Sequence, residues 1–292
     1  MGDYVLITAA HDEAAFIKKT CESIVAQTVR PLKWIIVDDA SVDGTASIVA
    51  RYRDAHPGLI ELLHIERPPG RDFRNKVQAF NVGLARVRQL GFVYVGNLDA
   101  DISLEPDYYA KILAQFERDP KLGIAGGMVA SYIDGTFIRQ NVAPDSVAGA
   151  VQLFRRQCFE DVGGYLPLWQ GGIDAAAEII ARRKGWTVQT FSDIIVLEHR
   201  RTGTATSTPL SARIKEGRRL YSLGYGFPFF LARCLRRSME RPRIIGSVIA
   251  LYGFLASALM RDPIVLPSDV VDYLRDEQRR KILRLFKFDH FA

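Results

Sequence analysis

This sequence of 292 residues has little cysteine, and its cysteines form no recognisable pattern. Cys21, Cys158 and Cys234 are odd in number and far apart, and no two of them stand in a C-x-x-C pair. A disulfide framework and a cysteine zinc site are therefore both excluded, and the thiols indicate a reducing compartment. The chain also opens on a strand-like run, without a basic stretch before a long apolar one, so we expect no secretory signal.

Two other signatures are missing. No G-x-G-x-x-G follows the first apolar run, so we do not expect an NAD-type cofactor. No serine or cysteine stands out as a nucleophile. Hydrophobic residues (48%) and charged residues (25%) are both at ordinary levels, which excludes a disordered or fibrous protein and predicts a globular chain with a real core.

The charge is distributed unevenly along the chain. The net charge is +6, but residues 1–199 carry 21 basic and 25 acidic side chains, while residues 200–292 carry 18 and 8. We therefore expect two physically different parts, a domain over residues 1–200 and a helical extension over residues 201–292. A basic part that also contains apolar runs suits an anionic membrane surface, with a solvated helical surface as the simpler alternative.

Apolar runs alternate with helical patterns over the first part. The expected strands are residues 4–10, 32–37, 60–65, 92–98 and 123–131. The expected helices begin near Asp12, Asp43, Lys76 and Pro106, with Asp12 as the first N-cap, and a later helix runs from Asp174 to Lys184. This alternation is typical of a Rossmann-like α/β fold with a mostly parallel sheet flanked by helices.

Acidic clusters follow three of the expected strands. They are Asp12-Glu13, Asp38-Asp39 and Asp99-Ala100-Asp101. One such residue is usually a turn former or a helix cap. Ligands of open α/β sheets, however, lie beyond the carboxyl ends of the strands. Three acidic strand ends on one edge therefore indicate a binding site.

The last cluster has the spacing D-x-D. In an extended chain, the carboxylates of Asp99 and Asp101 would leave the same side, roughly 7 Å apart. Two such charges repel each other unless a cation lies between them. Mg²⁺ or Mn²⁺, which shares its coordination shell with phosphates, is the natural occupant. The pattern therefore predicts a metal and diphosphate site.

Six segments together resemble the inverting family 2 glycosyltransferases, which have the GT-A fold. They are LITAAHDE (6–13), IIVDDASVDGT (35–45), RNKVQAFNVGL (74–84), NLDADIS (97–103), GGYLPLWQGGIDAAAE (163–178) and VLEHR (196–200). The resemblance implies transfer of a sugar from a nucleoside diphosphate, UDP most commonly, to an acceptor hydroxyl with inversion at the anomeric carbon. It also implies Mn²⁺ or Mg²⁺ as cofactor and a place in bacterial or archaeal polysaccharide assembly.

The resemblance implies roles for single residues. The implied nucleotide-sugar-binding residues are Ala9, Glu13, Asp39, Arg71, Lys76 and Asp99. Asp101 matches the metal ligand. His199 falls where some members place a histidine that completes the metal shell, although a histidine after a strand is otherwise structural.

Asp174 matches the catalytic base of the family. The family usually has Glu-Asp here, whereas this chain has Ile173-Asp174. Glu178, one turn later, replaces the missing carboxylate in part or faces solvent. Trp169 and Gly172 are candidates for an acceptor platform, with a core tryptophan as the alternative.

The extension contains seventeen uncharged residues, 244–260, flanked by arginines. Three interpretations stay open: an interfacial or re-entrant membrane helix, a buried core or dimer helix, and a true span. Residues 267–285 predict a charged closing helix. Arginines alternate with aromatic residues over 210–243, a pattern that can bind nucleic acid. The acidic clusters after the strands and the apolar run at 244–260 argue against such binding.

Resemblance favours the membrane interpretation of the extension, because many such enzymes extend glycans on polyprenyl-diphosphate lipids. The expected acceptor is therefore a glycan or a lipid-linked glycan. The expected location is cytoplasmic, peripheral on the inner face of the cell membrane, with a homodimer possible.

Two other functions compete with this interpretation. A non-catalytic GT-A scaffold of an envelope-assembly complex would not need the full acidic set of Asp39, Asp99, Asp101 and Asp174. A nucleotidyltransferase would normally have a glycine-rich basic loop after the first strand, where this chain has TAAHDE.

Overall fold

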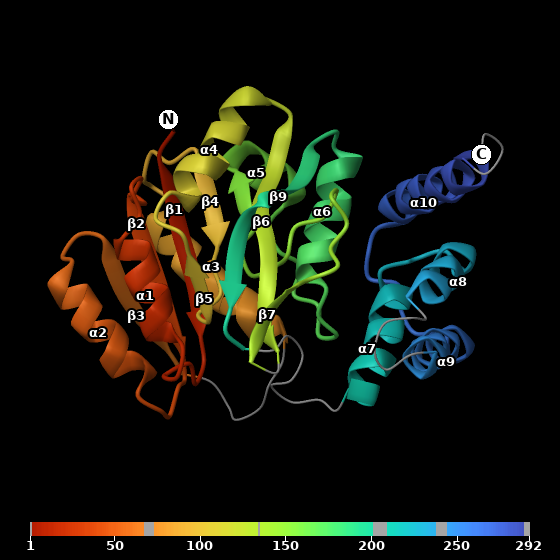
Figure 1. The fold of residues 1–292 in the computed structure, drawn as a ribbon, viewed down its shortest axis with the longest axis horizontal. Coiled ribbons are helices and arrows are strands. Elements are labelled where there is room, and N and C mark those ends of the chain that lie inside the picture. Colours follow the sequence, from red (N-terminus) through yellow and green to blue (C-terminus); the bar gives the residue numbers. More distant parts are fainter. Residues whose placement is uncertain (1, 67–72, 134, 201–208, 238–243, 289–292) are drawn as a thin grey trace. The chain divides into compact units, whose positions relative to one another are not determined.

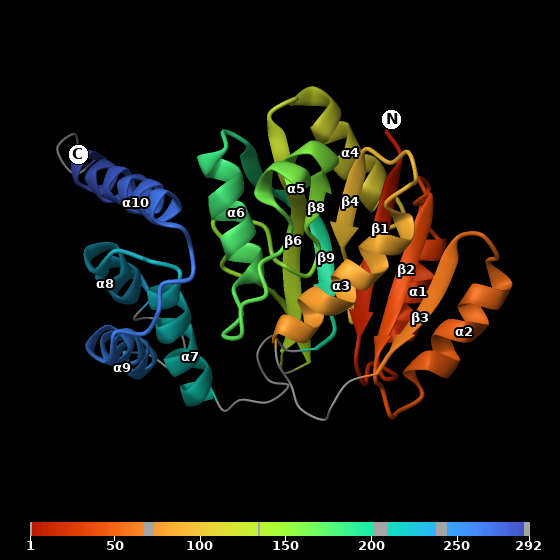
Figure 2. The same cartoon turned by 180° about the vertical axis from the view of Figure 1, so that it is seen from behind.

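The computed structural model describes residues 2–66, 73–133, 135–200, 209–237 and 244–288. The chain divides into two compact units, each taken by itself (Figures 1 and 2). The first unit comprises Met1–Trp169 with Ile173–Arg201, and the second comprises Gln170–Gly172 with Thr202–Ala292.

A single sheet organises the first unit. Its described strands are β1 (Tyr4–Ala10), β2 (Lys33–Asp39), β3 (Ile60–Ile65), β4 (Tyr94–Asn97), β5 (Ile102–Leu104), β6 (Leu122–Ile133), β7 (Thr136–Arg139), β8 (Leu153–Arg155) and β9 (Thr187–Glu198). They lie in the order β3-β2-β1-β4-β8-β6-β9-β5, and β7 pairs with β6. Most paired residues belong to parallel pairings, which join β1 to β2 and β4, β2 to β3, and β6 to β9. The predicted α/β fold with a mostly parallel sheet is confirmed.

Helices cover both faces of this sheet (Figures 1 and 2). They are α1 (Ile17–Val25), α2 (Thr45–Ala55), α3 (Phe73–Val87), α4 (Tyr108–Arg118), α5 (Arg156–Val162) and α6 (Ile173–Arg183). Because both faces are covered, the central strands are largely apolar, and every residue of β1 except Ala9 is buried.

The sequence located most of the longer elements but missed the twelve-residue strand β9, whose apolar residues are interrupted by Gln189, Ser192 and Asp193, and it missed several short elements. The strands expected at 4–10 and 60–65 have the predicted bounds. Strands β5, β7 and β8 were not predicted, because three or four residues are too few to show a hydrophobic period. The helix expected to begin near Lys76 begins three residues earlier, at Phe73, and ends at Val87.

The second unit is mostly helical over the residues that the structure describes. Its helices are α7 (Pro209–Ser222), α8 (Phe227–Arg236), α9 (Ile245–Met260) and α10 (Ser268–Phe288). Leu220, Phe230, Cys234, Ala250 and Phe254 form its buried core. Among the helices of the described residues, none combines the length and the apolar character that crossing a membrane takes.

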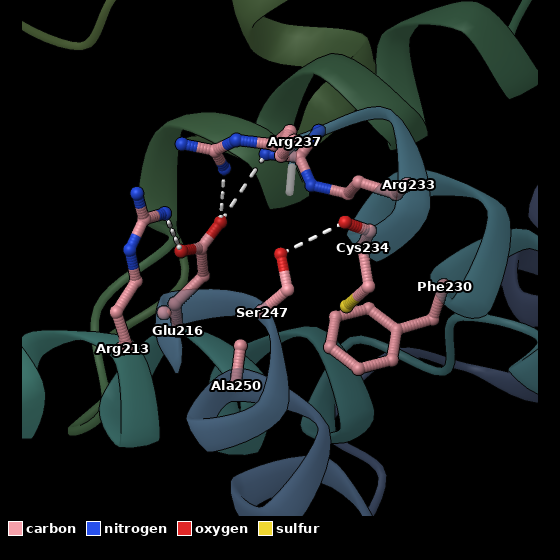
Figure 3. Close-up of a pocket in the computed structure, with 9 residues that line it drawn as sticks. Arg213, Glu216, Phe230, Arg233, Cys234, Arg237, Ser247 and Ala250 are labelled. Atoms are coloured by element: carbon pink, nitrogen blue, oxygen red, sulfur yellow. Dashed lines mark hydrogen bonds and ion pairs between the residues drawn. The ribbon is translucent and has the colours of Figure 1, made fainter. Parts of the chain in front are cut away.

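An ionic cluster joins α7 to α8 beside this core (Figure 3). The Glu216 carboxylate accepts hydrogen bonds from Arg213 at 2.9 Å, from Arg233 at 3.3 Å and from Arg237 at 2.5 Å. Burial by itself raises the pKa of Glu216, but the arginines outweigh it and hold the pKa at about 2. Glu216 is therefore ionised at neutral pH and ties two helices together.

Two glycines allow α7 and α9 to pack with their backbones close together. A methyl group at Gly217 would overlap the carbonyl oxygen of Ala250, and one at Gly253 would overlap that of Ile214. Since the clashing atoms belong to the backbone, neither can rotate away.

We predict that Gly253→Ala destabilises the second unit by about 1–3 kcal/mol, the usual cost of overpacking. The measurement is thermal unfolding by circular dichroism, together with hydrogen exchange of the α7 and α9 amides. Gly91→Ala is the matched control, because a methyl group there meets no atom within 4 Å. Equal melting temperatures for the two variants would contradict the close approach.

Candidate active site

The carboxyl ends of three parallel strands meet at one edge of the sheet. Strand β1 lies between β2 and β4, in registers that place Ala10 beside Asp38 and Ile7 beside Asn97. The segments that follow these strands therefore emerge together. This edge of the first unit is the acidic rim that the sequence predicted.

The loop after β1 is tied to the loop after β2. The expectation that Asp12 caps the first helix is wrong, because α1 begins at Ile17 without a side-chain cap. Instead Asp12 has φ of 54°, and its carboxylate accepts a hydrogen bond from the Val42 amide at 2.9 Å. The Glu13 amide in turn donates to the Thr45 hydroxyl at 2.8 Å. These bonds hold Glu13 at the rim.

Arg200 contacts Glu13 directly. Its guanidinium donates to Glu13 Oε2 at 2.6 Å and lies 5.3 Å from the centre of the Phe16 ring. The arginine-containing loop that begins at Arg200 suggested contact with the donor diphosphate or an inert linker, and neither interpretation identified Glu13 as the partner of Arg200. The arginine therefore connects the end of β9 to the loop after β1.

The nucleobase-side candidates lie on neighbouring strands. Ala9 is half-buried in β1 and pairs with Val37, and Asp39 is the last residue of β2 and is buried. His11 Nδ1 donates to the carbonyl oxygen of Asp39 at 2.6 Å, which joins the two strand ends. Arg71, the remaining candidate on this side, lies outside the described residues.

Lys76 lies among the carboxylates of the rim. Its Nζ donates to Asp99 Oδ1 at 2.5 Å, and Asn97 Nδ2 lies 3.3 Å from the same oxygen. Burial lowers the pKa of Lys76, but the charges of Asp99, Asp174 and Asp101 outweigh it and raise that pKa. One ammonium group is thus shared electrostatically by three carboxylates.

Helix α3 brings Lys76 to this place. Gly83 allows the helix to lie close to the sheet, because a methyl group there would stand 2.7 Å from Ile7 Cγ2. The close packing against β1 holds the first turns of α3 at the carboxyl edge.

The D-x-D segment is a turn, not the extended chain expected from its sequence. Residues 100 and 101 turn between β4 and β5, because the chain crosses from the middle of the sheet to its far edge. Burial and the charges of Asp99, Glu198 and Glu13 raise the pKa of Asp101 to about 8, against the opposing effect of Arg200. Negative charge is therefore concentrated around this carboxylate.

His199 follows β9 and has close neighbours at both ring nitrogens. Its Nε2 lies 2.6 Å from Ser103 Oγ, and its Nδ1 lies 3.4 Å from Lys19 Nζ. Burial and the Lys19 charge lower the pKa of His199, so the imidazole is neutral at pH 7. Its suggested role as a metal ligand would require it to exchange one of these partners.

The rim suits a cation that binds together with a diphosphate. No three acidic, histidine or cysteine side chains of the described residues are placed to hold a metal among themselves. Mg²⁺ is often bound by one or two carboxylates and completes its shell with substrate phosphates. The group of carboxylates around Asp101 fits that mode, and the described residues form no closed protein cage.

Asp174 lies in the first turn of α6. Two glycines in the left-handed region, Gly171 at φ 81° and Gly172 at φ 84°, lead the chain into this helix. Gly149 leaves the space that the carboxylate uses, because a methyl group there would stand 2.9 Å from Asp174 Oδ2. Trp169 is 58% exposed, so the alternative of a core tryptophan is wrong.

Glu178 is buried, so the alternative that it faces solvent is also wrong. Its carboxylate accepts hydrogen bonds from the Val147 amide at 2.7 Å, Gln152 Nε2 at 3.0 Å and the Ser146 hydroxyl at 2.8 Å. It connects α6 to the loop before β8, which carries Gly149. Burial and the charge of Asp174 raise the pKa of Glu178 to about 8, although these donors and Arg182 act to lower it.

This pKa has a consequence for stability. The folded state holds the Glu178 proton more tightly than the unfolded chain, whose pKa is near 4.5. The free energy of unfolding therefore falls as pH rises from about 5 to 8, by at most about 1.4 kcal/mol per pH unit for one proton.

We predict that Glu178→Gln removes this contribution to the pH dependence of the free energy of unfolding, because glutamine has no proton to lose. The measurement is urea unfolding at pH 5, 6.5 and 8. Parallel curves for the variant and the parent protein would show that Glu178 is ionised throughout.

Comparison with known proteins gives relatives for this arrangement. Residues 5–172 match the family described as Glycosyl transferase family 2. Poly-beta-1,6-N-acetyl-D-glucosamine synthase of Staphylococcus epidermidis is 25% identical over 176 residues, which cover 54% of this chain and 40% of that protein. The synthase of the same name from Staphylococcus aureus strain COL is 27% identical over 121 residues, 41% of this chain and 27% of that one. The matches thus span less than half the length of these curated relatives.

Two solved structures are similar in fold. Mannosyltransferase PcManGT from Pyrobaculum calidifontis, in complex with GDP-Man and Mn²⁺, has a TM-score of 0.57 and 19% identity, covering 94% of this chain and 80% of that one. S. aureus TarS 1-349, in complex with UDP-GlcNAc, has a TM-score of 0.55 and 15% identity, covering 87% and 71%. The family match extends over more than half of the chain and includes the strands that carry the acidic rim, and the chain belongs to glycosyl transferase family 2, with the GT-A fold.

Proposed function

We propose that this chain is a metal-dependent, inverting hexosyltransferase that moves a sugar from a nucleoside diphosphate, UDP most favoured, to a hydroxyl group of a glycan acceptor. The observation that carries the proposal is the position of Lys76. Its ammonium group interacts electrostatically with Asp99 and Asp101 on the donor side and with Asp174 on the acceptor side. A donor diphosphate and a catalytic base would therefore be close enough for direct transfer.

In this mechanism Asp174 accepts the proton of the acceptor hydroxyl as the oxygen attacks the anomeric carbon. Asp39 and Glu13 hold the nucleobase, and Asp99 binds the ribose. Lys76 leaves its bond with Asp99 and faces the diphosphate, where its charge stabilises the leaving group. A divalent cation held by Asp101, with His199 as a second candidate ligand, would neutralise further charge on that diphosphate.

Acceptor binding is proposed for the side of Asp174. Trp169 and Gly172 precede α6, and the exposed indole offers a flat apolar surface on which a sugar ring can stack. The curated relatives are named as synthases of a polymer of N-acetylglucosamine, which supports a glycan acceptor. We propose that this acceptor is lipid-linked and that the enzyme works at the cytoplasmic face of a membrane, as a monomer or a homodimer.

UDP is favoured as the donor base because it is the most common one in the family that the sequence resembles. The solved complexes of the fold relatives contain GDP-Man in one case and UDP-GlcNAc in the other, so the fold accommodates both bases. A scaffold without catalysis is the competing function. A scaffold would not need all four of the carboxylates Asp39, Asp99, Asp101 and Asp174. The variants Asp174→Asn and Asp101→Asn distinguish catalysis from a scaffold role.

We predict that Asp174→Asn lowers kcat for sugar transfer by about 10²–10⁴-fold, because an amide cannot accept the acceptor proton. Donor affinity, measured by calorimetry, should stay within a factor of about three. Asp54→Asn is the matched control, since Asp54 is an exposed aspartate of α2 that pairs with its neighbour Arg53. Full transfer activity in Asp174→Asn would exclude Asp174 as the base.

We further predict that Asp101→Asn abolishes metal-dependent stabilisation by nucleotides. A thermal-shift panel of UDP, GDP, dTDP, CMP and NAD with and without Mn²⁺ makes the measurement. A ligand at 100 times its Kd adds about 2.7 kcal/mol, which corresponds to a shift of roughly 5 °C or more. In the parent protein one nucleoside diphosphate should act only with metal, which would identify the base. An unchanged Mn²⁺-dependent shift in Asp101→Asn would refute the ligand assignment, and no shift with any nucleotide would favour the scaffold.

A further inference from the structure

Helix α9 exposes a row of apolar side chains. They recur every three or four residues along one face and are called the α9 stripe: Ile245, Val248, Tyr252, Leu255 and Leu259. Leu259 is 87% exposed, and the others are between 46% and 62% exposed. Only Tyr252 among them has a polar side-chain atom, so this face has almost no side-chain group that can form a hydrogen bond with water.

The opposite face of α9 is already used inside the second unit. Its buried residues are Gly246, Ala250, Gly253, Phe254 and Ser257. Phe254 stacks on Phe230 of α8 with ring centres 4.5 Å apart, and Gly253 lies against the backbone of α7. The α9 stripe is therefore a second apolar face, beyond what the core of the unit requires.

Neighbouring helix α10 has the ordinary pattern. Its exposed side chains are mostly charged, as in Asp272, Asp276 and Arg280, while Val271 and Leu274 are buried. A helix in contact with water normally has such a polar outer face, and a contiguous exposed apolar face marks an interaction surface. The α9 stripe is thus not a feature of α10, although α8 also exposes Phe227, Leu231 and Leu235.

Arginines lie near both ends of the stripe. Arg261 follows the last residue of α9 as its C-cap and is exposed. At the other end, the Ser247 hydroxyl donates to the Cys234 carbonyl at 2.8 Å, which places the last turn of α8 beside the first turn of α9 (Figure 3). That turn of α8 carries the exposed Arg236.

We propose that the α9 stripe inserts into the interface of an anionic lipid bilayer, with α9 lying along the membrane surface and these arginines contacting lipid phosphates. Sixteen residues make a helix about 24 Å long, shorter than the roughly 30 Å hydrocarbon core, which favours an orientation in the plane. A second copy is the competing occupant. Residues 200–292 carry 18 basic and 8 acidic side chains, so two such surfaces repel each other, whereas an anionic bilayer attracts them.

The test is flotation with vesicles of 30% phosphatidylglycerol in phosphatidylcholine, without donor or metal, so its result is independent of the proposed transfer reaction. The variant Val248→Glu/Leu259→Glu should lose at least about tenfold in the partition coefficient, because both charges would enter the interface. The matched control is Leu210→Glu/Leu283→Glu, which changes the same net charge at exposed leucines of α7 and α10. It should lose less than about threefold, and circular dichroism should show all variants folded.

A second measurement tests insertion itself. Tyr252→Trp should give a blue-shifted emission component with anionic vesicles, quenched by brominated lipid, that the parent protein lacks. Arg261→Ala should weaken partition by about fivefold, as expected for one basic group near the surface. The proposal is overturned if the parent protein does not partition, if both double variants lose partition equally, or if the Tyr252→Trp spectrum is unchanged. It is also overturned if the stripe variant only dissociates an oligomer in vesicle-free buffer, which would assign the α9 stripe to a second copy.

Discussion

The parallel alignment of β1, β2 and β4 forces like charges together, and much of the first unit is arranged around that constraint. Glu13, Asp99 and Asp101 meet at one edge because their strands end side by side. Their repulsion is offset by two cations from distant parts of the chain, Lys76 of α3 and Arg200 after β9. Burial and the neighbouring carboxylates still raise the pKa of Asp101, against the effect of Arg200. A cation that binds there together with a diphosphate would relieve the remaining repulsion between the carboxylates.

Glycine positions decide how closely the elements of each unit approach. Gly83 lets α3 pack on β1 and so brings Lys76 to the rim, and Gly149 leaves space for the Asp174 carboxylate. In the second unit, Gly217 and Gly253 let two helices meet backbone to backbone. In each case a single methyl group would collide with a neighbouring element or with the functional side chain itself. The geometry of the candidate site therefore depends on residues that take no part in its chemistry.

The two units differ in what their surfaces are suited to meet. The first unit gathers carboxylates at the edge of a sheet, which suits a cation and a phosphorylated ligand. The second unit has excess basic charge and exposes apolar side chains on α9, which suits an anionic apolar surface. An enzyme with a soluble donor and a lipid-linked acceptor would need both properties in one chain, and this is how the proposed function accounts for the uneven charge.

The sequence by itself determined the fold class, the family and the acidic clusters, because long apolar strands and short motifs are local properties of the chain. It also placed Asp174 in a helix, since the glycines before it and the helical pattern after it are contiguous. Only the tertiary structure decided that Asp12 fastens a loop instead of capping α1, that Asp99 and Asp101 stand on a turn, and that Glu178 is buried. It also paired Arg200 with Glu13 across 187 positions of sequence. These outcomes depend on which segments pack against each other, and hydrophobic periodicity carries no information about contacts between residues so far apart.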